Sequence, residues 1–194
     1  MIETVIEMMN EHNVAIKLFQ AKGVQNIIDA AEIIIDSMRN GGFLYLCGNG
    51  GSAADCQHIA GEFTGRFRKD RRALPAIAFT TDTSVLTCIG NDYKFENIFA
   101  RQCEAVITAK DVLWAFSTSG TSKNIFAAVD VAKRRGSKVL AFVGKQNSQL
   151  EQMADVCICA QSDITSTSQE VHQMAYHIIC NIVEQNLSKT EVKL

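Results

Sequence analysis

Five short apolar segments constrain the fold of this chain more than any other feature of its sequence. They lie at residues 43–47, 76–79, 112–116, 139–143 and 156–159. None shows the polar alternation of a strand with one solvent-facing side, so each reads as a strand buried on both faces. Helix-length segments separate most of them, which is typical of parallel strands joined by crossover helices. The sequence therefore predicts an α/β fold with a doubly wound, five-stranded parallel sheet.

The segments that flank this region have helical patterns. Apolar residues recur at helical spacing in the first forty residues, which end at Asn40-Gly41-Gly42, a glycine stop signal. We expect residues 1–40 to form an N-terminal helical hairpin that packs against another subunit because it is apolar. A long last helix is predicted from about Ser166 to Leu187. No linker or repeat interrupts the chain, so we expect a single domain over residues 1–194.

Composition narrows the class of protein further. Hydrophobic residues make up 47% and charged residues 21% of the chain, and the formal net charge is -2. This balance favours neither nucleic acid nor a membrane as partner. The seven cysteines are scattered without a Cys-x-x-Cys, and no signal peptide is evident, so we expect reduced thiols in a cytoplasmic protein. The basic run at residues 66–72 reads as a solvated connection, with a subunit or anion contact as the alternative.

Two polar loops each follow a predicted strand and precede a predicted helix. They are Cys47-Gly-Asn-Gly-Gly-Ser52 and Ser117-Thr-Ser-Gly-Thr-Ser122. The carboxyl ends of parallel strands form the ligand-binding edge of such a sheet. Glycines allow close approach of a ligand to the backbone, and helix N-termini offer free N–H groups to anions. Neither loop has the lysine of a Walker A motif. We therefore expect a phosphate of a small metabolite at these loops.

Histidine, glutamate and glutamine residues form a second candidate site. His58 and Glu62 lie four residues apart, so they share one face of the helix after the first loop. A surface pair is the simple interpretation, and an acid–base or metal pair is the alternative. Gln169, Gln173 and His177 form one stripe on the last helix. Imidazole and carboxylate suit zinc, although glutamine is an uncommon ligand.

Several stretches together resemble the signature of the phosphoheptose isomerases, a group within the SIS domain family. The resemblance covers essentially the whole chain. One departure stands at the start of the last helix, where the family usually has Ala-Arg-Ile and this chain has Ser166-Thr-Ser168. The motifs are residues 47–67, Thr80-Thr-Asp-Thr-Ser84, Gly90-Asn-Asp-Tyr93, Ser117–Ser122, Gln169-Glu-x-His172 and His177.

The resemblance implies a flavodoxin-like SIS fold, a homotetramer and one zinc ion per subunit. It implies isomerisation of sedoheptulose 7-phosphate to D-glycero-D-manno-heptose 7-phosphate through an enediol, the first step toward activated heptose for lipopolysaccharide. By matched position, Glu62 and His177 would be the acid–base pair, and His58, Glu62, Gln169 and His177 the zinc ligands. The implied substrate contacts are Asn49, Gly50, Gly51, Ser52, Asn91, Asp92, Ser117, Thr118, Ser119, Ser122 and Gln169.

Two rival functions share this fold. One branch of the family is non-catalytic and associates with the bacterial replication initiator, but it lacks the matched glutamate and second histidine. Glu62 and His177 therefore favour the enzyme. The other rival is a different SIS activity, either a sugar-phosphate-sensing regulator or an isomerase of another phosphosugar. A regulator would normally carry a DNA-binding segment, and none is evident in these 194 residues.

Overall fold

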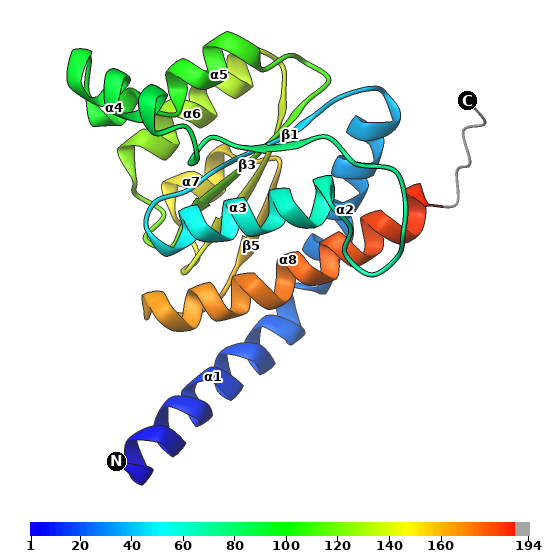
Figure 1. The fold of residues 1–194 in the computed structure, drawn as a ribbon. Coiled ribbons are helices and arrows are strands. Elements are labelled where there is room, and N and C mark those ends of the chain that lie inside the picture. The colour runs from blue at the N-terminus through cyan, green and yellow to red at the C-terminus, as the bar shows by residue number, and fades with distance from the viewer. Residues whose placement is uncertain (189–194) are drawn as a thin grey trace.

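The computed structural model describes residues 1–188 and contains the predicted five-stranded parallel sheet (Figure 1). The strand order is β2-β1-β3-β4-β5, and all four neighbouring pairs are parallel. In the shared register, Val112 of β3 lies opposite Leu44 of β1 and Lys138 of β4. The prediction of an α/β parallel sheet is confirmed. The strands are β1 (Leu44–Cys47), β2 (Ala76–Ala78), β3 (Val112–Ser117), β4 (Lys138–Val143) and β5 (Val156–Cys159).

Helices cover both faces of the sheet, which explains why the strands lack polar alternation. Leu44 and Leu46 of β1 belong to one core layer, while Tyr45 and Cys47 belong to the other. The first layer lies under α1 (Ile2–Lys22), α2 (Val24–Arg39), α3 (Gly51–Thr64) and α8 (Thr165–Leu187). The second lies under α4 (Thr83–Asp92), a 3-10 turn (Phe95–Asn97), α5 (Ala100–Val106), α6 (Lys123–Arg134) and α7 (Gln149–Met153).

The two N-terminal helices exist as predicted, but they do not form a hairpin. Gly23 alone joins them, and its backbone is in the right-handed helical region. Its N–H donates to the Phe19 carbonyl, and its own carbonyl accepts from the Ile27 N–H. Helical hydrogen bonding therefore runs through Gly23, so the chain bends there and cannot reverse. Figure 1 shows α1 and α2 running on from each other, with α1 extending away from the body.

The strand order places the two polar loops at a topological switch point. The chain leaves β1 for β2 on one side and leaves β3 for β4 on the other, while β1 and β3 are neighbours. Ligands of such sheets bind in the crevice between the two diverging connections. The loops after β1 and β3 therefore flank the expected crevice. Asn49 and Asn124 join them, because each side-chain amide donates to the other, at 2.9 and 2.8 Å.

The basic run at residues 66–72 is only partly the solvated connection that its composition suggests. The side chain of Arg71 is buried, and its Nε lies 3.3 Å from Oε1 of the buried Glu184 on α8. The Glu184 carboxylate also accepts the backbone N–H groups of Phe67, Arg68 and Lys69. Burial alone would raise the pKa of Glu184, but these donors and Arg71 lower it below its ordinary value. The run is thus anchored to α8 through one internal ion pair.

Two expectations from composition can be compared with the structure. None of the helices within residues 1–188 has the length and hydrophobicity that a membrane span requires. All seven cysteines lie in this part of the chain as free thiols, as predicted.

Candidate functional site

The helices α3 and α8 bring His58, Glu62 and His177 together. One ligand atom from each of the three side chains lies within 4.8 Å of the others. Helical spacing puts His58 and Glu62 on one face of α3. Figure 1 shows α8, the helix that carries His177, running beside α3. Residues from two helices that are far apart in sequence therefore form one cluster.

Contacts within this cluster orient its polar atoms. Nε2 of His58 lies 2.9 Å from Oε1 of Glu62. The Phe67 ring stacks on His177, with 5.6 Å between ring centroids. Burial, assisted by the neighbouring His58, lowers the pKa of His177 below its usual value. A neutral imidazole follows at physiological pH, and this form can accept a proton or bind a metal.

Two residues that the sequence did not single out lie on the side of His58 away from Glu62: Tyr176 contacts His58, and Asp55 contacts Tyr176. The Tyr176 hydroxyl lies 3.3 Å from Oδ1 of Asp55 and 3.3 Å from Nδ1 of His58. Burial raises the pKa of Asp55 above its ordinary value. Asp55 precedes His58 by three residues, and that helical spacing was a usable signal. No sequence signal pointed to Tyr176, because a fully buried tyrosine ring looks like an ordinary core residue.

The first loop needs glycine at two positions, one for its backbone conformation and one for a close contact. Gly50 has φ +56°, in the left-handed region that favours glycine. A Cβ on Gly51 would lie 2.5 Å from Nε2 of Gln169, so the start of α8 rests directly on this loop. Gln169 is thereby placed against the loop, while Ser52 is buried in the first turn of α3.

The second loop gathers hydroxyl groups at the N-terminus of α6. Oγ of Ser117 donates to Oγ of Ser122 over 3.0 Å, and Oγ of Ser119 accepts the Thr121 N–H over 3.2 Å. The Thr118 carbonyl accepts the Gly144 N–H, so Thr118 faces β4 through its backbone. Hydroxyls and the free N–H groups of a twelve-residue helix suit an anion such as phosphate.

Asn91 and Asp92 are predicted site residues that lie apart from both polar loops and from the cluster. They lie exposed at the end of α4, where Asn91 Nδ2 donates to Asp92 Oδ1 over 2.8 Å. Asp92 lines a cavity of about 680 Å³ among β2, α4 and α5, which does not include His58, Glu62 or His177. Hydrogen bonds from Asn91 and Cys88 lower the pKa of Asp92. The pair therefore faces a different surface of the subunit.

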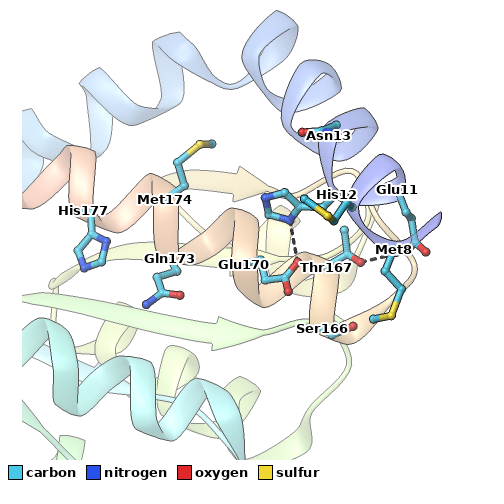
Figure 2. Close-up of a pocket in the computed structure, with 11 residues that line it drawn as sticks. Met8, Glu11, His12, Asn13, Ser166, Thr167, Glu170, Gln173, Met174 and His177 are labelled. Carbon is cyan, nitrogen blue, oxygen red and sulfur yellow. Dashed lines mark hydrogen bonds and ion pairs between the residues drawn. The ribbon is translucent and has the colours of Figure 1, made fainter. Parts of the chain in front are cut away.

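A groove of about 590 Å³ between α1 and α8 leads to His177 (Figure 2). His12 Nδ1 lies 2.7 Å from Glu170 Oε2 across this groove. Figure 2 shows Gln173 and His177 pointing to the same side of α8. The groove thus connects the N-terminal helix with the cluster.

Of the three residues that depart from the family pattern, Ser166 and Thr167 line this groove, and the side chains of Thr167 and Ser168 are buried. Oγ1 of Thr167 donates to Glu11 over 3.0 Å, and Oγ of Ser168 donates to the Ser162 carbonyl over 3.0 Å. Both hydroxyls therefore anchor the start of α8.

The cluster has the chemistry of a divalent metal site. Two imidazole nitrogens and a carboxylate oxygen are ligands that zinc accepts, and three protein ligands leave a position for substrate. Nε2 of His58 and the Glu62 carboxylate are close enough to share one cation. The residues present therefore fit a divalent metal ion.

Comparisons with known proteins find relatives that match most of this chain. The SIS domain family profile matches residues 9–144. A phosphoheptose isomerase of Geotalea uraniireducens is 42% identical over 187 residues, covering 96% of this chain and 99% of that protein. One from Clostridium acetobutylicum is 49% identical over 164 residues, covering 84% of each chain. The structure of phosphoheptose isomerase from Neisseria gonorrhoeae superposes with a TM-score of 0.90 at 38% identity, covering 94% of this chain and 98% of that one.

Proposed function

The chain belongs to the SIS domain family and is a sugar-phosphate isomerase of the phosphoheptose isomerase group, and from this premise we propose its reaction. The reaction is the conversion of sedoheptulose 7-phosphate to D-glycero-D-manno-heptose 7-phosphate. The observation that carries the proposal is the cluster of His58, Glu62 and His177 on α3 and α8, two helices that meet at the first polar loop, where Gln169 of α8 lies against Gly51. It combines a carboxylate and imidazoles with an anion site, as an aldose–ketose isomerase requires.

The phosphate is proposed to bind the second loop. The residues proposed to hold it at the N-terminus of α6 are Ser117, Thr118, Ser119 and Ser122. Ser52 lies in the first turn of α3. Hydroxyl and N–H donors hold a phosphate without adding charge, which favours reversible binding. Asn49, Gly50, Gly51 and Gln169 would contact the sugar chain. Binding energy at the remote phosphate would then hold C1 and C2 at the acid–base groups.

Glu62 is proposed to carry the proton between carbons. It takes a proton from C1 of the ketose while the C2 carbonyl oxygen gains one, which gives an enediol. Return of a proton to C2 and loss of the O1 proton give the aldose. His177, neutral because its pKa is lowered, would move the protons on the oxygens.

A zinc ion is proposed at the same cluster, with His58, Glu62, Gln169 and His177 as its ligands. Zinc there would supply Lewis-acid polarisation of the substrate carbonyl. Glu62 is thus proposed both as the base and as a zinc ligand beside His58, whose Nε2 lies 2.9 Å from Glu62 Oε1.

We further propose the setting in which the enzyme works. The chain is a single SIS domain over residues 1–194 that acts in the cytoplasm as a homotetramer, with active sites at subunit contacts. Asn91 and Asp92, which lie away from the cluster of their own chain, would meet substrate only from a neighbouring subunit. The product would enter activated heptose biosynthesis for lipopolysaccharide.

Product analysis tests the substrate assignment. Purified protein is incubated with a panel of ketose phosphates that includes sedoheptulose 7-phosphate, and the products are identified by NMR. We expect the heptose 7-phosphate as the main product. Turnover of a different ketose phosphate instead would assign the enzyme to another phosphosugar, and absence of turnover on the whole panel would favour the non-catalytic branch.

A further inference from the structure

The His58 ring is contacted at both nitrogens, and the second contact has no place in the proposed reaction. Nε2 faces Glu62 at 2.9 Å, and Nδ1 faces the Tyr176 hydroxyl at 3.3 Å. That hydroxyl also lies 3.3 Å from Oδ1 of Asp55. The four side chains therefore form a continuous line from Asp55 through Tyr176 and His58 to Glu62.

The donor in each contact follows from the chemistry of the groups. Oδ2 of Asp55 is buried without a hydrogen-bond partner in residues 1–188, so Oδ1 is the atom through which the carboxylate is satisfied. A carboxylate accepts, so the single Tyr176 hydrogen points to Asp55. The Tyr176 oxygen then remains an acceptor, and Nδ1 of His58 must carry the hydrogen that reaches it.

Fixing the Nδ1 hydrogen determines what His58 offers to the cluster. A neutral imidazole has one N–H, so its Nε2 presents a lone pair toward Glu62. A lone pair and a carboxylate at 2.9 Å attract only when a cation lies between them, either a proton or a metal ion. The opposite tautomer would satisfy Glu62 but would draw the Tyr176 hydrogen to Nδ1. Asp55 would then have neither oxygen satisfied.

We propose that Asp55 and Tyr176 are positioning residues that hold His58 with its hydrogen on Nδ1, so that the Nε2 lone pair is directed at a divalent metal shared with Glu62 and His177. The inference rests on the metal site under the proposed function. It adds a second layer to that site, since a hydrogen bond to the far nitrogen of a histidine ligand fixes its tautomer and its orientation. Neither residue would touch substrate.

Zinc affinity provides the first test. The affinity of metal-free protein for zinc is measured by competition with a chromophoric chelator for the natural chain, Tyr176→Phe and Asp55→Ala. Tyr176→Phe keeps the buried ring and removes only the hydroxyl. We expect roughly 10- to 100-fold weaker binding for it. Asp55→Ala should lose as much or more, because the freed Tyr176 hydrogen would turn to Nδ1. Tyr45→Phe, another buried tyrosine, is the matched control and should bind zinc normally.

A second measurement does not depend on metal. Nitrogen-15 NMR of the His58 ring in metal-free protein should show Nδ1 carrying a hydrogen in the natural chain. In Tyr176→Phe the hydrogen should move to Nε2, where Glu62 accepts it. A natural chain with the hydrogen on Nε2 alone would overturn the proposal, even if one of the variants did not fold.

His58→Ala separates this inference from the metal site itself. If His58→Ala weakens zinc binding strongly and both Tyr176→Phe and Asp55→Ala bind zinc normally, the positioning role is wrong and the metal site stands. If His58→Ala also binds zinc normally, the metal site is wrong, and the NMR result alone decides the tautomer.

Discussion

Glu62 is the residue on which the proposed mechanism depends most directly. Glutamine at this position would keep the size and hydrogen bonding of the side chain but could not accept a proton from carbon. Acid–base groups contribute roughly a hundred- to ten-thousand-fold to rate. We therefore expect Glu62→Gln to lower kcat by at least about a hundredfold, measured as heptose 7-phosphate formed from sedoheptulose 7-phosphate.

Controls separate this loss from a general effect on the protein. Glu32→Gln changes an exposed glutamate of α2 and should leave kcat unchanged. His177→Ala should also lower kcat, and the double variant should be little worse than the poorer single one, because the two groups act together. Near-normal turnover of Glu62→Gln would show that another group is the base.

The ion pair of Glu184 with Arg71 leads to a prediction about stability, not catalysis. Glutamine there would leave the buried Arg71 without its ion pair, and breaking a buried pair on one side costs about 3–5 kcal/mol. We expect Glu184→Gln to lower the free energy of unfolding in urea at pH 7 by about that amount. A loss below about 1 kcal/mol would contradict this account of the anchor.

The difference in free energy of unfolding between the natural chain and Glu184→Gln should depend on pH in a definite direction. The pKa of Glu184 is lowered on folding, so its contribution is present above the ordinary value of 4.5 and is lost as the pH falls through the folded value. The difference in stability between the natural chain and Glu184→Gln should therefore narrow below pH 4.5. Urea unfolding measured at pH 7 and below pH 4.5 checks this, and a difference that widens toward acid would contradict it.

At the residue scale, sequence reasoning succeeded where spacing carried the information. His58 and Glu62 are four apart, so one helix is enough to pair them. Their meeting with His177 required α3 and α8 to pack together, which no local pattern contains. Tyr176 was missed because a buried tyrosine looks like core until its hydroxyl is seen beside Asp55 and His58.

Among the elements, the second loop has the most specific predicted role. Ser119→Ala combined with Ser122→Ala removes two hydroxyls at the α6 N-terminus and retains the backbone N–H groups. We expect roughly 10-fold or greater loss of sugar-phosphate affinity by calorimetry, since each hydrogen bond to a charged group contributes about 1.5–3 kcal/mol. Ser84→Ala, at an exposed position in α4, should bind normally. Unchanged affinity in the double variant would remove the phosphate from this loop.

The elements themselves show what local pattern can and cannot predict. The five strands match the five apolar segments to within one residue at every end, because burial on both faces leaves little choice of residue. The N-terminal hairpin was wrong because helical spacing of apolar residues predicts two helices but not the angle between them. In the structure Gly23 keeps helical geometry, so it introduces a bend between two helices that both pack on α8.

On the scale of the whole molecule, the site is spread over distant parts of the chain. The strand order places both loops at the switch point, and the alternation of apolar segments was enough to predict a parallel sheet there. The position of Asn91 and Asp92 on another surface could not be predicted, because it depends on how α4 packs. One chain therefore forms the candidate acid–base cluster, but it does not bring Asn91 and Asp92, which the resemblance assigns to substrate binding, to that cluster.

The first turns of α1 give the last prediction, which concerns assembly. Residues 1–10 are all exposed, and Ile2, Val5, Ile6 and Met9 form one apolar face of a helix that extends from the body (Figure 1). An exposed apolar face of this kind is typical of a surface that packs against another chain. We expect sedimentation at micromolar concentration to show a homotetramer, and Val5→Glu with Ile6→Glu to dissociate it. Glu7→Lys, on the opposite face of α1, should stay assembled. The groove between α1 and α8 leads to His177, and the active sites are proposed to lie at subunit contacts. The dissociated variant should therefore also lose turnover. A natural chain that is a stable, active monomer would contradict the prediction.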